Sequence, residues 1–104
     1  MSEKFIQLAR LDEVKPGKML CVVHGNQRIM LANVDGTIHA VDDMCSHEDA
    51  SLSTGSLKGD CVKCPLHGSR FDLNTGEPLD EPAYEPIRVY PVKIDGDAIC
   101  VAID

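Results

Sequence analysis

The chain has 104 residues, the size of one small domain, and its 43% hydrophobic and 26% charged residues are ordinary for a globular protein. The net charge of −7 argues against binding to nucleic acid or to an acidic membrane surface. The longest apolar run, residues 19–23, is far shorter than the roughly 18 residues of a membrane span. Charged residues among the first fifteen argue against a secretory signal, so we expect a cytoplasmic protein.

Short β-branched and apolar runs separated by turn residues predict an all-β protein with very little helix. Asp35-Gly36 is a strong signal for a two-residue hairpin, and Asp95-Gly96-Asp97 marks a second hairpin near the C-terminus. A turn or a single helical turn is expected at 11–17. In chain order, strands are expected at residues 5–8, 19–23, 28–34, 37–41, 60–63, 70–73, 87–94 and 98–103.

The middle of the chain differs from both ends. From about residue 43 to residue 80 it is rich in Ser, Gly, Asp and Cys, and prolines at 78, 82, 86 and 91 then force extended backbone. We therefore expect one domain. An antiparallel β-sandwich base, residues 1–42 and 81–104, would carry an inserted loop-rich subdomain at about 43–80.

The net charge is confined to this middle part of the chain. Residues 42–85 contain ten acidic and three basic residues, a difference of −7, whereas seven acids and seven bases balance outside. Two interpretations remain open. The segment is either a solvated acidic face or a surface that docks a basic partner, in which case the charge acts on association rate more than on affinity.

Two of the five cysteines each lie close to a histidine. Cys45-Ser46-His47 gives C-x-H, and 16 residues later Cys64-Pro65-Leu66-His67 gives C-x-x-H. Structural zinc sites commonly use C-x₂₋₄-C and H-x₃₋₅-H spacings, and neither occurs here. Mixed pairs suit a Rieske [2Fe–2S] centre, in which two Cys bind one iron and two His bind the other.

The sequence resembles the Rieske family through these two motifs, the second continuing as CPLHGS. "LSTGSLKGD" and "PVKIDGDAICVAI" make it similar to the Rieske-type ferredoxins of bacterial aromatic ring-hydroxylating dioxygenase systems. The resemblance implies one [2Fe–2S] cluster held by Cys45, His47, Cys64 and His67. It implies a one-electron carrier rather than an enzyme, which takes electrons from a ferredoxin reductase and passes them to a terminal oxygenase. No small-molecule substrate is expected, and a shuttle between two partners is expected to be a monomer.

The resemblance also places four residues around the cluster. Gly68 is expected to allow a backbone shape that lets amide donors approach sulfide, and Pro82 to belong to the family's proline loop. In the respiratory branch a Ser and a Tyr after the second His donate hydrogen bonds to sulfur. Ser69 fits the first position, but Phe71 at the second has no donor. A missing donor to sulfur disfavours the reduced state, so we expect a reduction potential in the lower half of the Rieske range of about −150 to +300 mV.

The sequence bears on three other functions. A cluster-bearing small subunit of nitrite reductase shares this fold, and a zinc-stabilised interaction module is a remote alternative. An oxygenase catalytic subunit needs a mononuclear iron site, commonly two His and one carboxylate. Only His24 and His39 remain for it, in a chain too short for a second domain, so this function is rejected. Of the other cysteines, Cys21 and Cys100 are expected to be small buried hydrophobes and Cys61 a strand thiol.

Overall fold

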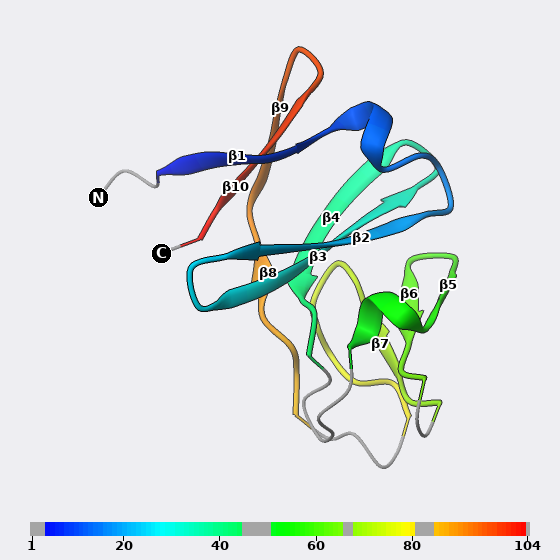
Figure 1. The fold of residues 1–104 in the computed structure, drawn as a ribbon. Helices are drawn as coiled ribbons and strands as arrows, with labels where there is room; N and C mark the ends of the chain where they lie inside the picture. The colour runs from blue at the N-terminus through cyan, green and yellow to red at the C-terminus, as the bar shows by residue number, and fades with distance from the viewer. Residues whose placement is uncertain (1–3, 45–50, 66–67, 81–84, 104) are drawn as a thin grey trace.

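The computed structural model describes residues 4–44, 51–65, 68–80 and 85–103. These residues form ten strands and two single-turn 3₁₀ helices (Figure 1). The strands are β1 Phe5–Arg10, β2 Met19–His24, β3 Gln27–Val34, β4 Thr37–Asp42, β5 Ser56–Lys58, β6 Cys61–Lys63, β7 Arg70–Asp72, β8 Val89–Tyr90, β9 Val92–Asp95 and β10 Ala98–Ala102. The 3₁₀ helices are η1 Leu11–Glu13 and η2 Leu52–Thr54.

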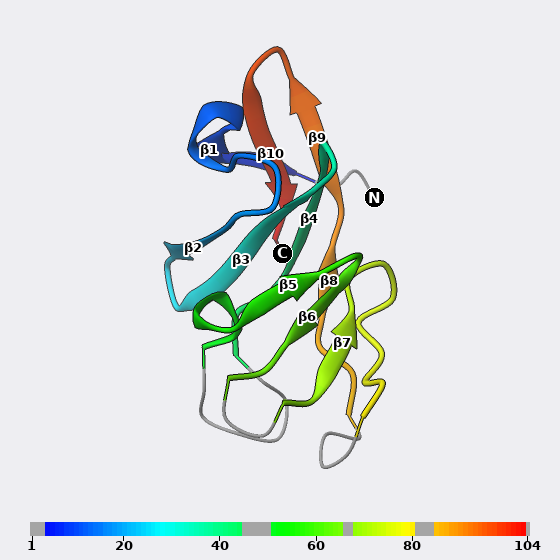
Figure 2. The same cartoon turned by 90° about the vertical axis from the view of Figure 1, so that its right-hand side faces the viewer.

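The strands pair into three antiparallel sheets, which confirms the predicted all-β fold. Their orders are β1-β10-β9, β2-β3-β4-β8 and β5-β6-β7. The β5-β6-β7 sheet, called the small sheet below, lies at the end of the molecule away from the β9–β10 hairpin (Figures 1 and 2). No described helix is long and apolar enough to cross a membrane.

Strand β3 is buried on both faces and separates two apolar cores. Because successive side chains of a strand point to opposite faces, Ile29 and Leu31 enter one core while Met30 and Ala32 enter the other. The base core consists of Ala9, Val14, Ile29, Leu31, Ile38, Ala40, Tyr90, Ile99, Val101 and Ile103. The site-side core consists of Met30, Ala32, Val41, Leu52, Val62, Cys64, Phe71, Leu73 and Ile87.

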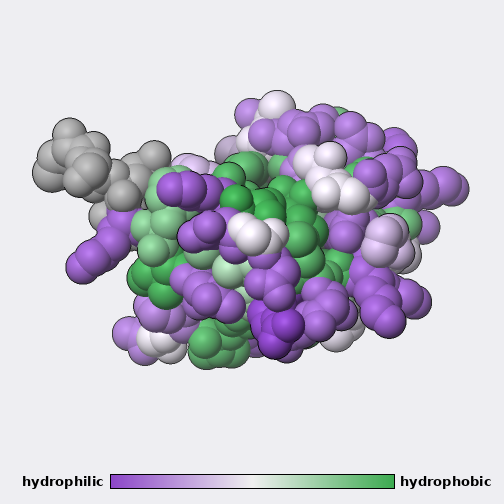
Figure 3. Space-filling view, turned by 90° about the horizontal axis from the view of Figure 1, so that it is seen from above, coloured by the Kyte–Doolittle hydropathy of each residue, from purple (hydrophilic) through white to green (hydrophobic). Residues whose placement is uncertain are grey.

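Both predicted hairpins form. Asp35 and Gly36 have φ angles of 52° and 94°, the left-handed values that a type I′ turn requires, and they join β3 to β4. At the second hairpin Asp95 pairs with Ala98, so the connection between β9 and β10 is the two-residue Gly96-Asp97. The end of the molecule that carries this second hairpin shows apolar side chains framed by polar ones (Figure 3).

Two strand predictions were incomplete. Residues 87–94 were expected as one strand but form two, because Pro91 has no N–H to give to a ladder. The chain changes sheets at this proline: β8 pairs with β4, and β9 pairs with β10. Strand β5 was not predicted, since only Leu57 in it is apolar and a glycine lies on each side.

Candidate metal centre

Among the four predicted ligands, Cys64 lies in the described part of the chain. It directly follows β6, is 1% exposed and belongs to the site-side core. Cys45, His47 and His67 lie outside the described residues, as does Pro82. The described ranges hold no group of three or more His, Cys, Asp or Glu that could bind a metal ion.

The CPLHGS segment is the loop of the β6–β7 hairpin. Strands β6 and β7 pair with Lys63 opposite Arg70, so residues 64–69 connect them. The Cys64 N–H donates to the Ser69 carbonyl at 2.8 Å, and the Gly68 N–H donates to the Cys64 carbonyl at 3.1 Å. The loop that carries Cys64 is thus closed by its own backbone.

Gly68 has the conformation that favours glycine. Its φ is 74°, and a Cβ there would lie 3.1 Å from Lys63 Cε. We expected this glycine to bring amide donors toward sulfide, but its own N–H is bonded to the Cys64 carbonyl. Gly68 therefore shapes the loop, and its own amide serves the turn.

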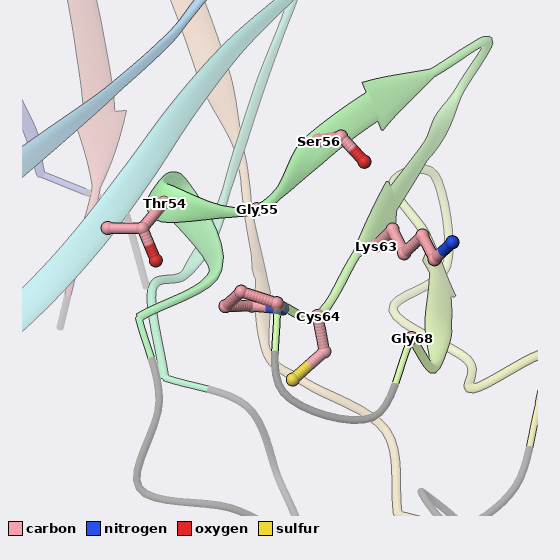
Figure 4. A pocket seen from close by; sticks show the side chains of 7 residues that line it. Thr54, Gly55, Ser56, Lys63, Cys64 and Gly68 are labelled. Atoms are coloured by element: carbon pink, nitrogen blue, oxygen red, sulfur yellow. The ribbon is translucent and has the colours of Figure 1, made fainter.

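A cavity of about 450 Å³ lies beside Cys64 (Figure 4). It is lined by Thr54, Gly55, Ser56, Lys63, Cys64, Pro65 and Gly68. The Cys64 sulfur and the Lys63 amine point in opposite directions in this view, as expected for successive residues at a strand end.

The segment after the first motif lies directly against the segment that carries the second. Ser56 is paired with Lys63 across β5 and β6. A Cβ on Gly55 would overlap the backbone carbonyl oxygen of Lys63, so only glycine permits this close approach. This arrangement fits a group held between two loops, because the described flanks of both motifs meet here.

The two ends of residues 45–50 are also held together. Met44 and Ser51 form an isolated antiparallel β bridge. The Leu52 N–H donates to the Asp43 carbonyl at 2.5 Å, and the Asp43 N–H donates to the Arg28 carbonyl at 3.0 Å. The described residues on either side of 45–50 therefore meet at one place beside β3.

Asp43 carries a fully buried carboxylate at this point. Its Oδ2 accepts hydrogen bonds from Arg28 Nη2 at 3.2 Å, from Cys21 Sγ at 3.4 Å and from Ser51 Oγ. Its Oδ1 accepts the Ser53 N–H at 2.9 Å. Burial acts to raise the pKa of Asp43, but the hydrogen bonds from Ser51 and Ser53 outweigh it and leave the pKa below its ordinary value.

Sequence reasoning missed this role of Asp43. In the sequence, Asp43 is only one member of an acidic segment, and Cys21 is predicted to be a small buried hydrophobe. Asp43 is not part of any solvated acidic face, and Cys21 is only half-buried and donates to it. Burial first, and then the Asp43 charge, raise the pKa of the Cys21 thiol. The only available signal was a pair of aspartates before C-x-H, which does not say which one turns inward.

Ser69 and Phe71 are both fully buried beside the predicted ligand. The Ser69 carbonyl accepts the Cys64 N–H, which places Ser69 in the same loop as Cys64. The Ser69 side chain is shielded from water. Phe71 packs in the site-side core that also contains Cys64. Its ring therefore contributes to a dry, apolar surrounding for that sulfur, which is one way a protein tunes an iron–sulfur site.

The described cysteines form no disulfide. Cys61 begins β6 opposite Asp72, as a strand thiol was expected to. Burial first, and then the charge of Asp72, raise the pKa of the Cys61 thiol, which makes it less reactive. Cys100 lies half-buried in β10.

Residues 4–91 match the Rieske [2Fe-2S] domain family. The chain is 42% identical, over 93% of its length and 90% of the relative's, to the biphenyl dioxygenase ferredoxin subunit of Pseudomonas sp. strain KKS102. The solved ferredoxin of carbazole 1,9a-dioxygenase from Nocardioides aromaticivorans IC177 superimposes with a TM-score of 0.91 at 33% identity, covering 96% of this chain and 98% of that one.

Two further solved structures bear on the choice of partner. A complex of reduced oxygenase and oxidised ferredoxin in carbazole 1,9a-dioxygenase contains a chain with a TM-score of 0.90 at 30% identity, covering 97% of this chain and 94% of that one. A putative nitrite reductase small subunit has a TM-score of 0.81 at 26% identity, covering 94% of this chain and 97% of that one. Together with the buried Cys64 of CPLHGS, the match over residues 4–91 shows that this chain belongs to the Rieske [2Fe–2S] domain family.

Proposed function

We propose that this protein is the one-electron carrier of an aromatic ring-hydroxylating dioxygenase system. It accepts an electron from a ferredoxin reductase, delivers it to a terminal oxygenase and acts on no substrate of its own. One observation carries the proposal: the relative that is 42% identical over nearly the full length of both chains is a dioxygenase ferredoxin subunit. The likeness to a nitrite reductase small subunit is weaker, at 26% identity, so that function is the second candidate.

The ligands follow from the two motifs. Cys45 and Cys64 would bind one iron of the cluster, and His47 and His67 the other. The buried position of Cys64 and the meeting of the flanks of both motifs at Gly55 support this assignment. When bound, the cluster supplies reversible one-electron chemistry.

The protein's own residues set the surroundings of that chemistry. The hairpin loop orients Cys64, and the site-side core with Phe71 keeps water from its sulfur. The Ser69 hydroxyl is buried in the same loop. We assign the binding of the cluster to a subdomain at about 43–80, of which the small sheet is the regular part, and assign the base to 1–42 and 81–104.

Docking is proposed to use the acidic middle of the chain. Of its acids in the described ranges, Asp60, Glu77 and Glu85 are exposed, whereas Asp43 is buried. An exposed acidic surface attracts a basic partner over a distance that salt shortens, from about 30 Å at 0.01 M to about 8 Å at 0.15 M ionic strength. The rate of electron transfer is therefore expected to fall as salt is added.

The first test measures the iron, zinc and acid-labile sulfide content of the purified protein. Two iron and two acid-labile sulfide per chain, with the EPR spectrum of a mixed His/Cys cluster after reduction, are expected. Stoichiometric zinc without sulfide would instead indicate the zinc-stabilised interaction module.

The second test measures electron transfer from the reduced protein to its proposed partner. The reduced protein is mixed with a ring-hydroxylating oxygenase, and reoxidation is followed at low and high salt. Rapid, salt-sensitive transfer is expected. A loaded protein that cannot reduce the oxygenase but does reduce a nitrite reductase would overturn the assignment of the partner.

A further inference from the structure

Asp43 lies two residues before the proposed ligand Cys45 and contacts three separate parts of the fold. Arg28 of β3 and Cys21 of β2 donate to its Oδ2 at 3.2 and 3.4 Å. On the other side of the first motif, Ser51 Oγ donates to Oδ2 and the Ser53 N–H donates to Oδ1 at 2.9 Å. One carboxylate thus joins the sheet to both ends of residues 45–50.

These bonds are of the kind that hold a position firmly. Hydrogen bonds to an ionised carboxylate are roughly twice as strong as bonds between neutral groups. The carboxylate is fully buried, so the loss of its donors would not be compensated by water. The bridge between Met44 and Ser51 closes the same loop through the backbone.

The neighbouring aspartate has different contacts. Asp42 Oδ1 accepts the Tyr90 hydroxyl at 2.5 Å, and Asp42 Oδ2 accepts the Arg88 N–H at 3.3 Å. Asp42 therefore fastens β4 to β8, whereas the hydrogen bonds of Asp43 reach the segment after the first motif. Two adjacent carboxylates, similarly near to Cys45 in the chain, have separate tasks.

We propose that Asp43 is a positioning residue of the [2Fe–2S] site, because its carboxylate ties the sheet to the residues that flank 45–50, the segment with Cys45 and His47. The inference rests on the ligand set proposed above. Two residues of extended chain span at most about 7 Å, so the Asp43 Cα lies within that distance of the Cys45 Cα. Its negative charge is thus close enough to disfavour the arrival of an electron, in addition to fixing the loop.

The test compares Asp43→Asn with Asp42→Asn. Asparagine keeps the shape of Asp43 but replaces one carboxylate oxygen by a donor, which cannot accept the bonds from Arg28, Cys21 and Ser51. We expect Asp43→Asn to shift the reduction equilibrium about tenfold toward the reduced state, a rise of about 59 mV for one electron. Its EPR g-values should also change, whereas Asp42→Asn should retain the wild-type g-values and shift the potential less.

Ser51→Ala is the second variant, because it removes one closing bond and leaves the charge in place. It should change the g-values with a smaller change in potential than Asp43→Asn. Wild-type potential and g-values in both Asp43→Asn and Ser51→Ala would overturn the inference, as would equal shifts in Asp42→Asn and Asp43→Asn. These results leave the proposed function standing, whereas a wild-type protein without iron and sulfide refutes both.

Discussion

The two cores of this small protein are built in different ways. The base core lies between two sheets with longer strands. The β2–β3 and β3–β4 ladders are regular, and the β1–β10 ladder is interrupted by one register shift between Gln7 and Ala9. The site-side core is closed by the small sheet, which has three strands of three residues each. Individual contacts at Gly55, Asp43 and Cys64 supply the order that such short strands cannot.

This difference indicates which parts of the protein tolerate substitution. In the base core a side chain of similar size and polarity preserves the structure, since pattern and volume are the main requirements. We call the described residues of 43–80, which surround the site-side core, the site-side region. There the structure depends on single contacts, such as the close approach at Gly55 and the hydrogen bonds to Asp43. Strand β3 contributes to both cores through alternate residues, so this one strand joins the base to the region around the proposed cluster.

The largest expected effect contrasts two glycines. Gly55→Ala puts a methyl group into the backbone carbonyl of Lys63, next to Cys64, and should cost about 3 kcal/mol or more with much reduced iron content. Gly96→Ala, in the β9–β10 turn, meets no neighbour within 4 Å and should cost about 1 kcal/mol for its left-handed φ of 65°. Urea unfolding and iron analysis of both variants measure the contrast. Equal losses of stability would show that the site-side region is no more constrained than the base.

The next effect concerns Phe71, which is fully buried in the site-side core. Phe71→Tyr should cost about 1–3 kcal/mol because a hydroxyl enters an apolar core. It should also raise the midpoint potential, by roughly 40 mV for a bond to sulfur that differs by about 1 kcal/mol between redox states. Phe71→Leu is the control, since it changes packing without adding a donor. An unchanged or lower potential in Phe71→Tyr would refute the donor argument.

Sequence reasoning succeeded where a pattern reports a local physical requirement. Short β-branched and apolar runs with Asp-Gly turns predicted most strands of the base. C-x-H and CPLHGS predicted the Rieske family, which the match over residues 4–91 shows, and the four ligand residues stay a prediction. CPLHGS also lies where a loop was expected, between two short strands.

The features that the sequence did not reveal depend on tertiary structure. The inward turn of Asp43 rather than Asp42 depends on donors from β2, β3 and the segment at 51–53, which only the fold brings together. The need for glycine at 55 depends on a backbone oxygen of another strand. The division of 87–94 at Pro91 could have been anticipated from the missing N–H, but not the change of sheet that accompanies it.

A smaller effect is expected in the base, at Tyr90. Burial first, and then its hydrogen bond to Asp42, raise the pKa of Tyr90 to about 12. A raised pKa means that the stabilisation is fully present below the unfolded value of 10 and is lost as the pH rises through 12. Tyr90→Phe should cost about 1 kcal/mol at neutral pH, the usual worth of one hydrogen bond.

Tyr90→Phe has no hydroxyl to ionise, so it should not show the loss of stability at alkaline pH that ionisation of Tyr90 causes in the wild-type protein. Chemical unfolding between pH 9 and pH 12 measures the difference between the wild-type protein and Tyr90→Phe. The difference should narrow as the pH rises and the wild-type tyrosine ionises. A difference that is constant over this range would show that the hydroxyl is not held in its neutral form by the fold.

The smallest effect is expected on the surface of the site-side region. Arg70 Nε and Nη2 bond to the two oxygens of Asp80 at 2.6 and 3.2 Å, and the hydrogen bond from Arg70 is the main cause of the lowered pKa of Asp80. A lowered pKa gives stability that is present above the unfolded value and lost as the pH falls below it. Because the pair is solvent-exposed, Asp80→Asn should destabilise less than Tyr90→Phe, and the loss should shrink in 1 M salt.

The measurement for Asp80 is the difference in unfolding midpoint between the wild-type protein and Asp80→Asn, from pH 6 down to pH 3. Any acid lability of a bound cluster is common to both proteins and cancels in this difference, which should therefore narrow with falling pH. A difference that persists at low pH and in high salt would come from packing instead. In that case the Arg70–Asp80 pair would resemble the contacts at Gly55 and Asp43. The stability of the site-side region would then depend on single contacts at its surface as well as in its buried part.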